Sequence, residues 1–299
     1  MNNIGKDSQR KKDILNTHPC LSAEAHGKYA RIHLPVAPAC NINCRYCERK
    51  YDCVSESRPG VTSRVLSPRE AVERVIALSE RNERLRVIGV AGPGDPLANE
   101  GTFEFFSAAR RELPHLTFCA STNGLLLTDR INDLVECGVQ SLTITINAVT
   151  PATAEAIYSW ITIGGRRFQG FTAAERLIAS QWAGAMLAVK AGLLVKINTI
   201  YIPGVNNHEI PVIAARAGNI GVEIMNVMPL IPQAGFSHLK RPSCRELDLM
   251  RAECGKHVKQ MVHCTQCRAD AFGLLGEDGD MDLELVNAGI GEDYCEMVS

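Results

Sequence analysis

The stretch YARIHLPVAPACNINCRYC, residues 29–47, joins a strand-like segment to a loop that carries three cysteines. Its first eight residues alternate between polar and apolar side chains, as in a β-strand with two different faces. Arg31 and His33 therefore share one face, opposite the aliphatic side chains. Because a barrel strand packs its apolar face against a helix, we expect Arg31 and His33 to face the lumen.

Strand-like and helix-like segments alternate along most of the chain. Residues 67–70, SPRE, form a capping box with proline at the first helical position. The expected strands are 29–36, 85–90, 116–121, 141–146, 194–201 and 222–227. The first expected helix begins at residue 68. The other expected helices lie near 102–112, 129–137, 173–191, 209–217 and 245–262. This order implies parallel strands with right-handed crossovers. Six units are fewer than the eight of a full barrel, so we predict an α/β fold, an open partial (βα)6 barrel.

Both ends of the chain fall outside this alternation. We divide the chain into an N-terminal extension at 1–28, the partial barrel at 29–262 and a C-terminal extension at 263–299. Residues 164–167, GGRR, lie after the fourth strand, where we expect a loop over the mouth of the barrel. The extensions carry cysteines at positions 20, 264, 267 and 295.

Composition excludes several classes of function. The 299 residues contain 32 Lys and Arg against 33 Asp and Glu, which gives no support to a nucleic-acid partner. Residues 1–16 have no apolar stretch of signal-peptide length, and the most apolar window, 183–195, is too short to span a bilayer. We therefore expect a cytoplasmic protein with no membrane partner. Clustered cysteines in that compartment bind metal or do redox chemistry more often than they form disulfides.

Cys40, Cys44 and Cys47 form a CxxxCxxC loop directly after the first expected strand. Soft thiolates select zinc or an iron–sulfur cluster. A 4Fe-4S cluster held by three cysteines keeps one iron without a protein ligand, and that iron can chelate the amino and carboxylate groups of S-adenosylmethionine (SAM). The alternative is a structural zinc site with a fourth ligand elsewhere. The loop stands at the face of the barrel where active sites lie, which favours the cluster.

With this spacing the chain resembles the radical SAM superfamily. The resemblance implies that the reduced cluster cleaves SAM to give a 5′-deoxyadenosyl radical. Tyr46 matches the superfamily position that packs on the adenine. The sequence GPGDP at 92–96 matches the glycine-rich turn that holds the methionine amino group, although it is also compatible with an ordinary turn. The cofactor-binding candidates in and after this turn are Gly92, Gly94, Asp95, Thr122, Asn123 and Asn147.

Further motifs narrow the resemblance to the NifB family of nitrogenase-cofactor biosynthesis proteins. They are HPC at 18–20, APAC at 37–40, RKYDC at 49–53, ESRPG at 56–60, CTQCRADA at 264–271 and GLLGED at 273–278. Many members of this family carry an additional C-terminal carrier domain. This chain ends too early for one, so it resembles the short form.

This family resemblance implies a distinct reaction. Two further 4Fe-4S clusters, K1 and K2, are substrates that are fused around a carbide from the SAM methyl group. A sulfur donor such as sulfite supplies one more sulfur, which completes an eight-iron precursor of the nitrogenase cofactor (NifB-co). The implied cofactors are three 4Fe-4S clusters and SAM. The implied partners are iron–sulfur delivery proteins and nitrogenase cofactor scaffold or carrier proteins.

The resemblance also assigns ligands to the two substrate clusters. The positions that match the K1 ligands are His33, Cys53 and Cys119. The positions that match the K2 ligands are Cys20, Cys264 and Cys267. From the residues alone, Cys119 is equally compatible with a small buried core residue, and His33 is more typical of a core histidine that bonds to a neighbour. The alternatives for the CxxC at 264–267 are half of a zinc site and a thioredoxin-like redox pair. The redox pair is disfavoured, because no strand precedes the motif and no proline lies between its cysteines.

Glu56 and Arg58 are the catalytic candidates, because they are charged residues of a family motif near the clusters. We expect them to handle protons or anionic sulfur species, and a solvated ion pair is the alternative. His18 is a possible neighbour of a cluster, although surface histidines are more common. Helical patterns indicate structural roles for the cysteines at 137, 244 and 254, and Cys295 lies in a polar tail.

Three other functions are compatible with these patterns. One is another radical SAM enzyme with auxiliary clusters that acts on a peptide or small molecule. The second is a non-catalytic iron–sulfur scaffold, and the third is a zinc-binding structural module. Cleavage of SAM separates the enzymes from the scaffold, and elemental analysis identifies zinc.

Overall fold

The computed structural model describes residues 3–48, 53, 64–264, 266–275 and 279–280. Its centre is an eight-stranded sheet in the order β11-β10-β1-β3-β4-β5-β8-β9. Six neighbouring strands of this sheet, β1-β3-β4-β5-β8-β9, are parallel. The predicted partial (βα)6 barrel is therefore confirmed. Their bounds are β1 Ala30–His33, β3 Leu85–Val90, β4 Thr117–Thr122, β5 Val139–Thr145, β8 Leu194–Tyr201 and β9 Ile224–Pro229.

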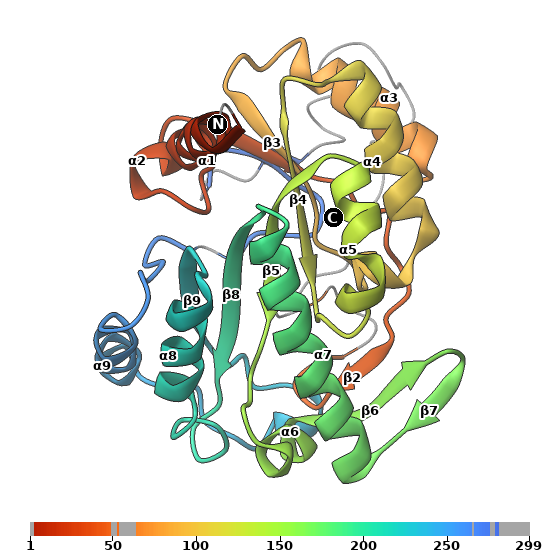
Figure 1. Cartoon of the computed structure of the whole chain (residues 1–299). Helices are drawn as coiled ribbons and strands as arrows, with labels where there is room; N and C mark the ends of the chain where they lie inside the picture. Colours follow the sequence, from red (N-terminus) through yellow and green to blue (C-terminus); the bar gives the residue numbers. More distant parts are fainter. Residues whose placement is uncertain (1–2, 49–52, 54–63, 265, 276–278, 281–299) are drawn as a thin grey trace, which may run out of the picture.

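Helices between and after these strands lie along the outer face of the curled sheet (Figure 1). They are α3 Pro68–Ser79, α4 Glu100–Glu112, α5 Leu127–Glu136, α7 Gly170–Lys190, α8 Ile210–Ile220 and α9 Cys244–Cys254. The connections after β3, β5 and β9 contain the 3-10 turn η1 Pro96–Ala98, the short helix α6 Pro151–Ile157 and the 3-10 turn η2 Ala234–Phe236. The predicted capping box begins α3. Ser67 Oγ accepts a hydrogen bond from the backbone N–H of Glu70, and the Glu70 carboxylate accepts one from the backbone N–H of Ser67. Within the described residues, we find no helix with the length and apolarity to cross a membrane.

Residues 158–168 form a hairpin, so the expectation of a loop over the barrel mouth was wrong. Strands β6 Tyr158–Ile163 and β7 Arg166–Phe168 meet at Gly164 and Gly165. Both glycines have positive φ (56° and 75°), as a two-residue type I′ turn requires. β6 also pairs with β2, Ile42–Cys44, in the cysteine loop (Figure 1). The hairpin thus fixes the backbone between the first two cysteines of that loop.

The N-terminal extension forms two helices, α1 Asn3–Thr17 and α2 Ala23–His26, that the sequence did not predict. The chain around them packs at the amino ends of the last two parallel strands. Ile14 and Leu21 bury their side chains with Leu194 of β8 and Ile224 of β9. This contact brings the chain between α1 and α2 to the base of the barrel.

The last expected helix, 245–262, ends early. The helix α9 stops at Cys254, and Gln260 then pairs in parallel with Met225 of β9. Backbone bonds on both sides of Met225 hold this pairing. An edge strand offers unpaired backbone groups, and Lys259 and Met261 satisfy those of Met225 in β9.

The C-terminal extension pairs with the opposite edge of the sheet. Strand β10, Ala271–Gly273, runs antiparallel to β1 and pairs in turn with β11, Gly279–Asp280. Residues 259–273 therefore cross from one edge of the partial barrel to the other. We call residues 259–273 the strap; it carries Cys264 and Cys267 across the open side of the barrel.

Gly218 of α8 provides a test of how tightly the segment just before the strap is packed. A Cβ atom there would lie 2.3 Å from the carbonyl oxygen of His257. Alanine normally stabilises a helix interior by about 1 kcal/mol over glycine. Here the overlap must displace backbone, so we expect Gly218→Ala to destabilise the fold by about 1–3 kcal/mol in urea unfolding. Gly101→Ala in α4 is the control, because its Cβ would have no atom nearer than 3.5 Å. Equal stabilities of the two variants would contradict this packing.

Candidate functional site

The three cysteines of the CxxxCxxC loop and Cys53 line one cavity at the carboxyl ends of β3, β4 and β5. We call it the first cavity. Burial raises the pKa of the Cys44 thiol well above its usual range, and Cys47 and Cys40 raise it further. A metal removes the proton of a coordinating thiol, so crowded buried thiols suit a cationic iron core. The donor set fits a 4Fe-4S cluster held by three cysteines.

The glycine-rich turn docks on the backbone that precedes the cysteines. The backbone N–H of Gly94 donates to the carbonyl oxygen of Ala37 at 2.6 Å, and that of Asp95 donates to the oxygen of Ala39 at 2.9 Å. A Cβ atom on Gly94 would lie 2.1 Å from the oxygen of Ala39. Only glycine permits this approach.

Asn99 completes this contact and was missed by the sequence analysis. Its side chain accepts from the backbone N–H of Ala39 (3.1 Å) and donates to the carbonyl oxygen of Ala39 (2.9 Å). It therefore fixes the residue next to Cys40. Asparagine before a helix normally indicates an N-cap, yet Asn99 makes no capping bond with α4. No local signal distinguishes the two roles.

The carboxylate of Asp95 joins the turn to the end of β4. It accepts from Oγ1 of Thr122 (2.9 Å) and from the backbone N–H groups of Asn123 (2.6 Å) and Leu97 (2.9 Å). Burial nonetheless raises the pKa of Asp95 to about 6. Asp95 and Thr122 both line the first cavity, but their polar atoms bind each other. They position the wall of the site.

Asn123 lies beside the cysteines. Its side-chain amide donates to Oδ1 of Asn41 at 2.7 Å and lies 3.9 Å from Sγ of Cys40. Because Asn123 also lines the first cavity, it is placed to contact a molecule bound on the open iron of a cluster there.

Asn147 holds two tyrosines at the wall of the first cavity. Its amide nitrogen donates to the hydroxyl groups of Tyr46 (2.7 Å) and Tyr158 (3.1 Å). Its oxygen accepts from the backbone N–H of Ile200 at 2.8 Å. Asn147 is thus fully engaged, and both tyrosines line the cavity. Tyr158 begins β6, so the unpredicted hairpin supplies this residue.

A second cavity lies toward the amino ends of the strands. Sulfur and imidazole side chains from β1, β4, the N-terminal extension and the strap line it: His33, Cys119, Cys20, Cys264 and Cys267. Ser121 lines both cavities, so the two adjoin. Arg31 and His33 face this lumen as predicted. Cys119 is in the middle of β4.

The second cavity is rich in positive charge. Arg31 and Lys196 line it and are both buried. Burial raises the pKa of Cys20 to about 12, while the charge of Lys196 opposes this shift. None of the described residues that line this cavity is Asp or Glu. The positive charge of these two side chains suits an anionic group in the cavity, such as a thiolate-bound cluster.

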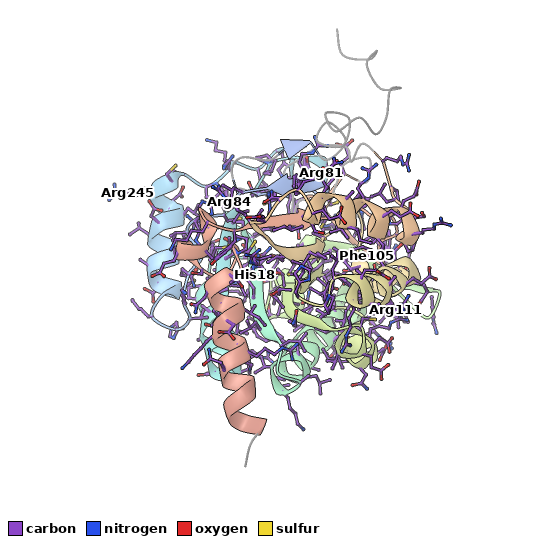
Figure 2. The ribbon with its side chains drawn as sticks, turned by 90° about the horizontal axis from the view of Figure 1, so that it is seen from above. His18, Arg81, Arg84, Phe105, Arg111 and Arg245 are labelled. Atoms are coloured by element: carbon purple, nitrogen blue, oxygen red, sulfur yellow. The ribbon has the colours of Figure 1, made fainter. Side chains whose placement is uncertain are left out.

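His18 also lines the second cavity, although the sequence favoured a surface position. Figure 2 shows it near the middle of the molecule, whereas Arg111 and Arg245 lie at the periphery. Its ring is 2% exposed. Burial, and after it the charge of Lys196, lowers the pKa of His18 to about 3. The imidazole is therefore neutral.

The structure does not bring every predicted ligand together. Cys53 lines the first cavity and not the second, so it does not stand beside His33 and Cys119. Gly92 lines neither cavity, and a Cβ there would touch Ala269 at 3.4 Å. Within the described part of the chain, no three His, Cys, Asp or Glu side chains converge on the position of a single metal ion. A cube of four irons separates its ligands more widely.

The other candidates lie elsewhere. Glu56, Arg58 and Cys295 are outside the described residues. Cys137 and Cys254 are buried, Cys244 is exposed, and none of the three lines either cavity.

Comparison with known proteins agrees with this geometry. The model of the "Radical SAM superfamily" matches residues 34–217. The chain belongs to the radical SAM superfamily. Among solved superfamily-like folds, the Streptococcus suis SuiB structure aligns with a TM-score of 0.55 and 12% identity over 87% of this chain and 55% of that chain. The structure of anSMEcpe with bound AdoMet aligns with a TM-score of 0.50 and 14% identity, over 78% of this chain and 64% of that chain. These likenesses show the fold alone.

Relatives of higher identity are named "FeMo cofactor biosynthesis protein NifB". The chain is 45% identical to the Klebsiella pneumoniae protein over 89% of this chain and 58% of the relative. It is 42% identical to that of Herbaspirillum seropedicae (88% and 52%) and 39% identical to that of Chlorobaculum tepidum (88% and 63%). The chain thus spans 52–63% of the length of these three relatives.

Gly94→Ala tests the contact that positions the first cavity. The new Cβ would overlap the backbone of Ala39, so the cysteine loop must move. We expect SAM cleavage by the anaerobically reconstituted chain to fall more than about tenfold, because a small displacement of reacting groups is costly. The control is Gly27→Ala, whose Cβ meets nothing within 4 Å. Undiminished cleavage in Gly94→Ala would show that the contact is dispensable.

Asp95 predicts a pH dependence of stability. Its pKa is about 6 in the fold against an ordinary value of 3.8. Across that window the folded chain retains a proton that the unfolded chain has lost, so stability falls as the pH rises. Asp95→Asn cannot ionise. Relative to the parent, it should therefore gain about 1 kcal/mol in urea unfolding between about pH 5 and pH 7. The exposed Asp129→Asn is the control. A relative stability of Asp95→Asn that does not change with pH would contradict the assignment.

Proposed function

We propose that this chain is a radical SAM enzyme that fuses two 4Fe-4S clusters into the eight-iron nitrogenase cofactor precursor, with a SAM-derived carbide and an added sulfur. The observation that carries the proposal is the pair of adjoining cavities. One holds the CxxxCxxC cysteines, and the other gathers four cysteines and two histidines. A barrel that only activates SAM has no need of the second set. The identity to NifB proteins over almost nine-tenths of this chain supports the same function.

In the proposed reaction, Cys40, Cys44 and Cys47 hold the resident cluster. When bound, that cluster supplies the electron that cleaves SAM and yields the 5′-deoxyadenosyl radical. The first cavity encloses the site with Tyr46 and Tyr158, and apolar walls around a radical exclude side reactions with water. Gly94 and Asp95 position the loop, and Asn123 is the side chain best placed to contact SAM.

We place the K1 substrate cluster at the junction of the two cavities. Ser121 lines both, His33 and Cys119 approach from the second, and Cys53 approaches from the first. Ligands on opposite walls of the junction support a cluster between them. His33 suits a cluster that must be released, since neutral imidazole is a less soft donor to iron than thiolate.

We place the K2 substrate cluster deeper, among Cys20, Cys264 and Cys267. The N-terminal extension and the strap supply these ligands, and both pack on the barrel. The proposal retains Glu56 and Arg58 as groups that handle protons or the sulfur donor. It also includes iron–sulfur delivery proteins and cofactor carriers as partners.

The alternatives from the sequence are less well supported. A zinc module or a scaffold does not require a SAM-type cavity beside the cysteines. Another superfamily enzyme with auxiliary clusters has the same ligands but acts on an external substrate. A small-molecule substrate would need room beside the first cavity, where the second cavity presents thiols and cations instead.

Iron content after anaerobic reconstitution tests the proposal. Three cubes of four irons predict about twelve irons per chain. Cys44→Ala should lose about four irons and all SAM cleavage, because its cavity holds the resident cluster. Cys264→Ala should also lose about four irons but should still cleave SAM. The control is Cys244→Ala, an exposed cysteine that lines neither cavity.

Saturation of the parent chain near four irons would refute the fusion proposal. So would an unchanged iron content in Cys264→Ala. Loss of SAM cleavage in Cys264→Ala, with the first cluster retained, would show that the two cavities do not act separately.

A further inference from the structure

His18 offers a hydrogen-bond donor to the second cavity. The backbone N–H of Cys20 donates to Nδ1 of His18 at 3.2 Å. Because Nδ1 uses its lone pair as an acceptor, the proton of the imidazole is on Nε2. A nitrogen that carries a proton has no lone pair for iron. His18 is therefore a donor and not an iron ligand.

The donor atom has no acceptor in the protein. Nε2 of His18 is buried and has no hydrogen-bond partner among the described residues. A buried polar group without a partner costs about 1–3 kcal/mol, and such groups are rare in folded proteins. Since the ring lines the second cavity, a group bound there can supply the acceptor.

The surroundings determine the chemistry of that acceptor. The positive side chains of Lys196 and Arg31 line the same cavity and favour a negatively charged occupant. Cys20 is held by the same hydrogen bond that orients the imidazole. The acceptor is therefore an anionic, sulfur-rich group bound beside Cys20. A cluster sulfide or a coordinated thiolate fits this description.

We propose that His18 donates its Nε2–H to a sulfur of the substrate cluster held by Cys20, Cys264 and Cys267, and that this bond raises the reduction potential of the cluster. The inference rests on the proposed function, which places a cluster in this cavity. Hydrogen bonds to the sulfurs are among the determinants of cluster potential. A donor stabilises the reduced state because that state carries more negative charge.

Two substitutions separate the donor role from a role in local structure. His18→Asn can still accept from the backbone N–H of Cys20 but is too short to place a donor where Nε2 stands. His18→Gln can place an amide N–H near that position. The control is His208→Asn, since the side chain of His208 is 65% exposed.

The measurement is a potentiometric titration of the reconstituted full chain, followed by electron paramagnetic resonance and accompanied by iron analysis. The signal of the second-cavity cluster is the one that Cys264→Ala removes. In His18→Asn we expect the equilibrium constant for reduction of this cluster to fall about tenfold, which is about 59 mV for one electron. His18→Gln should lie closer to the parent, and His208→Asn should equal it.

A parental potential in both His18 variants would overturn the inference and leave the proposed function intact. Loss of the cluster from both variants would also overturn it, because His18 would then be needed for assembly itself. Loss from His18→Asn alone would support the donor role. If the parent chain shows no signal that Cys264→Ala removes, the proposed function fails and the inference fails with it.

Discussion

The approach of Gly94 to the carbonyl oxygen of Ala39 is the contact on which the first cavity depends. The turn after β3 and the loop after β1 meet through their backbones. They are so close that any residue larger than glycine at position 94 would overlap Ala39. Asp95 extends the contact to β4, and Asn99 secures its other side. The connections that follow β1, β3 and β4 therefore together determine where the cysteine loop begins. The unpredicted pairing of β2 with β6 fixes the same loop from the outside.

The second cavity depends on the ends of the chain. A partial barrel has two free sheet edges, and the strap pairs with both of them. The same crossing delivers Cys264 and Cys267 to the amino ends of the strands, where the N-terminal extension delivers His18 and Cys20. The strap thus covers the two sheet edges and also supplies cysteines to the second cavity. This arrangement leaves a cavity lined by thiols and imidazoles in a lumen that side chains usually fill.

The sequence predicted the features that are encoded locally. Strand periodicity located the six parallel strands, and the alternation in β1 correctly directed His33 into the lumen. It could not predict contacts between distant segments. The hairpin that holds β2, the early end of α9 at the edge of β9 and the bond from Asn99 to Ala39 all depend on partners far away in the chain. The burial of His18 also follows from packing that only the fold reveals. The family resemblance assigned Cys53 to the K1 ligands. Only the structure shows that Cys53 lines the first cavity and not the second.

The central claim is that two adjoining cavities of one barrel each hold iron. Anomalous scattering from crystals of the anaerobically reconstituted chain, recorded at the iron edge, tests it most directly. The account predicts iron density in the first cavity beside Cys44 and separate density in the second cavity beside Cys20 and Cys264. Iron confined to the first cavity, with Cys264 and Cys267 bound to nothing or to each other, would contradict it.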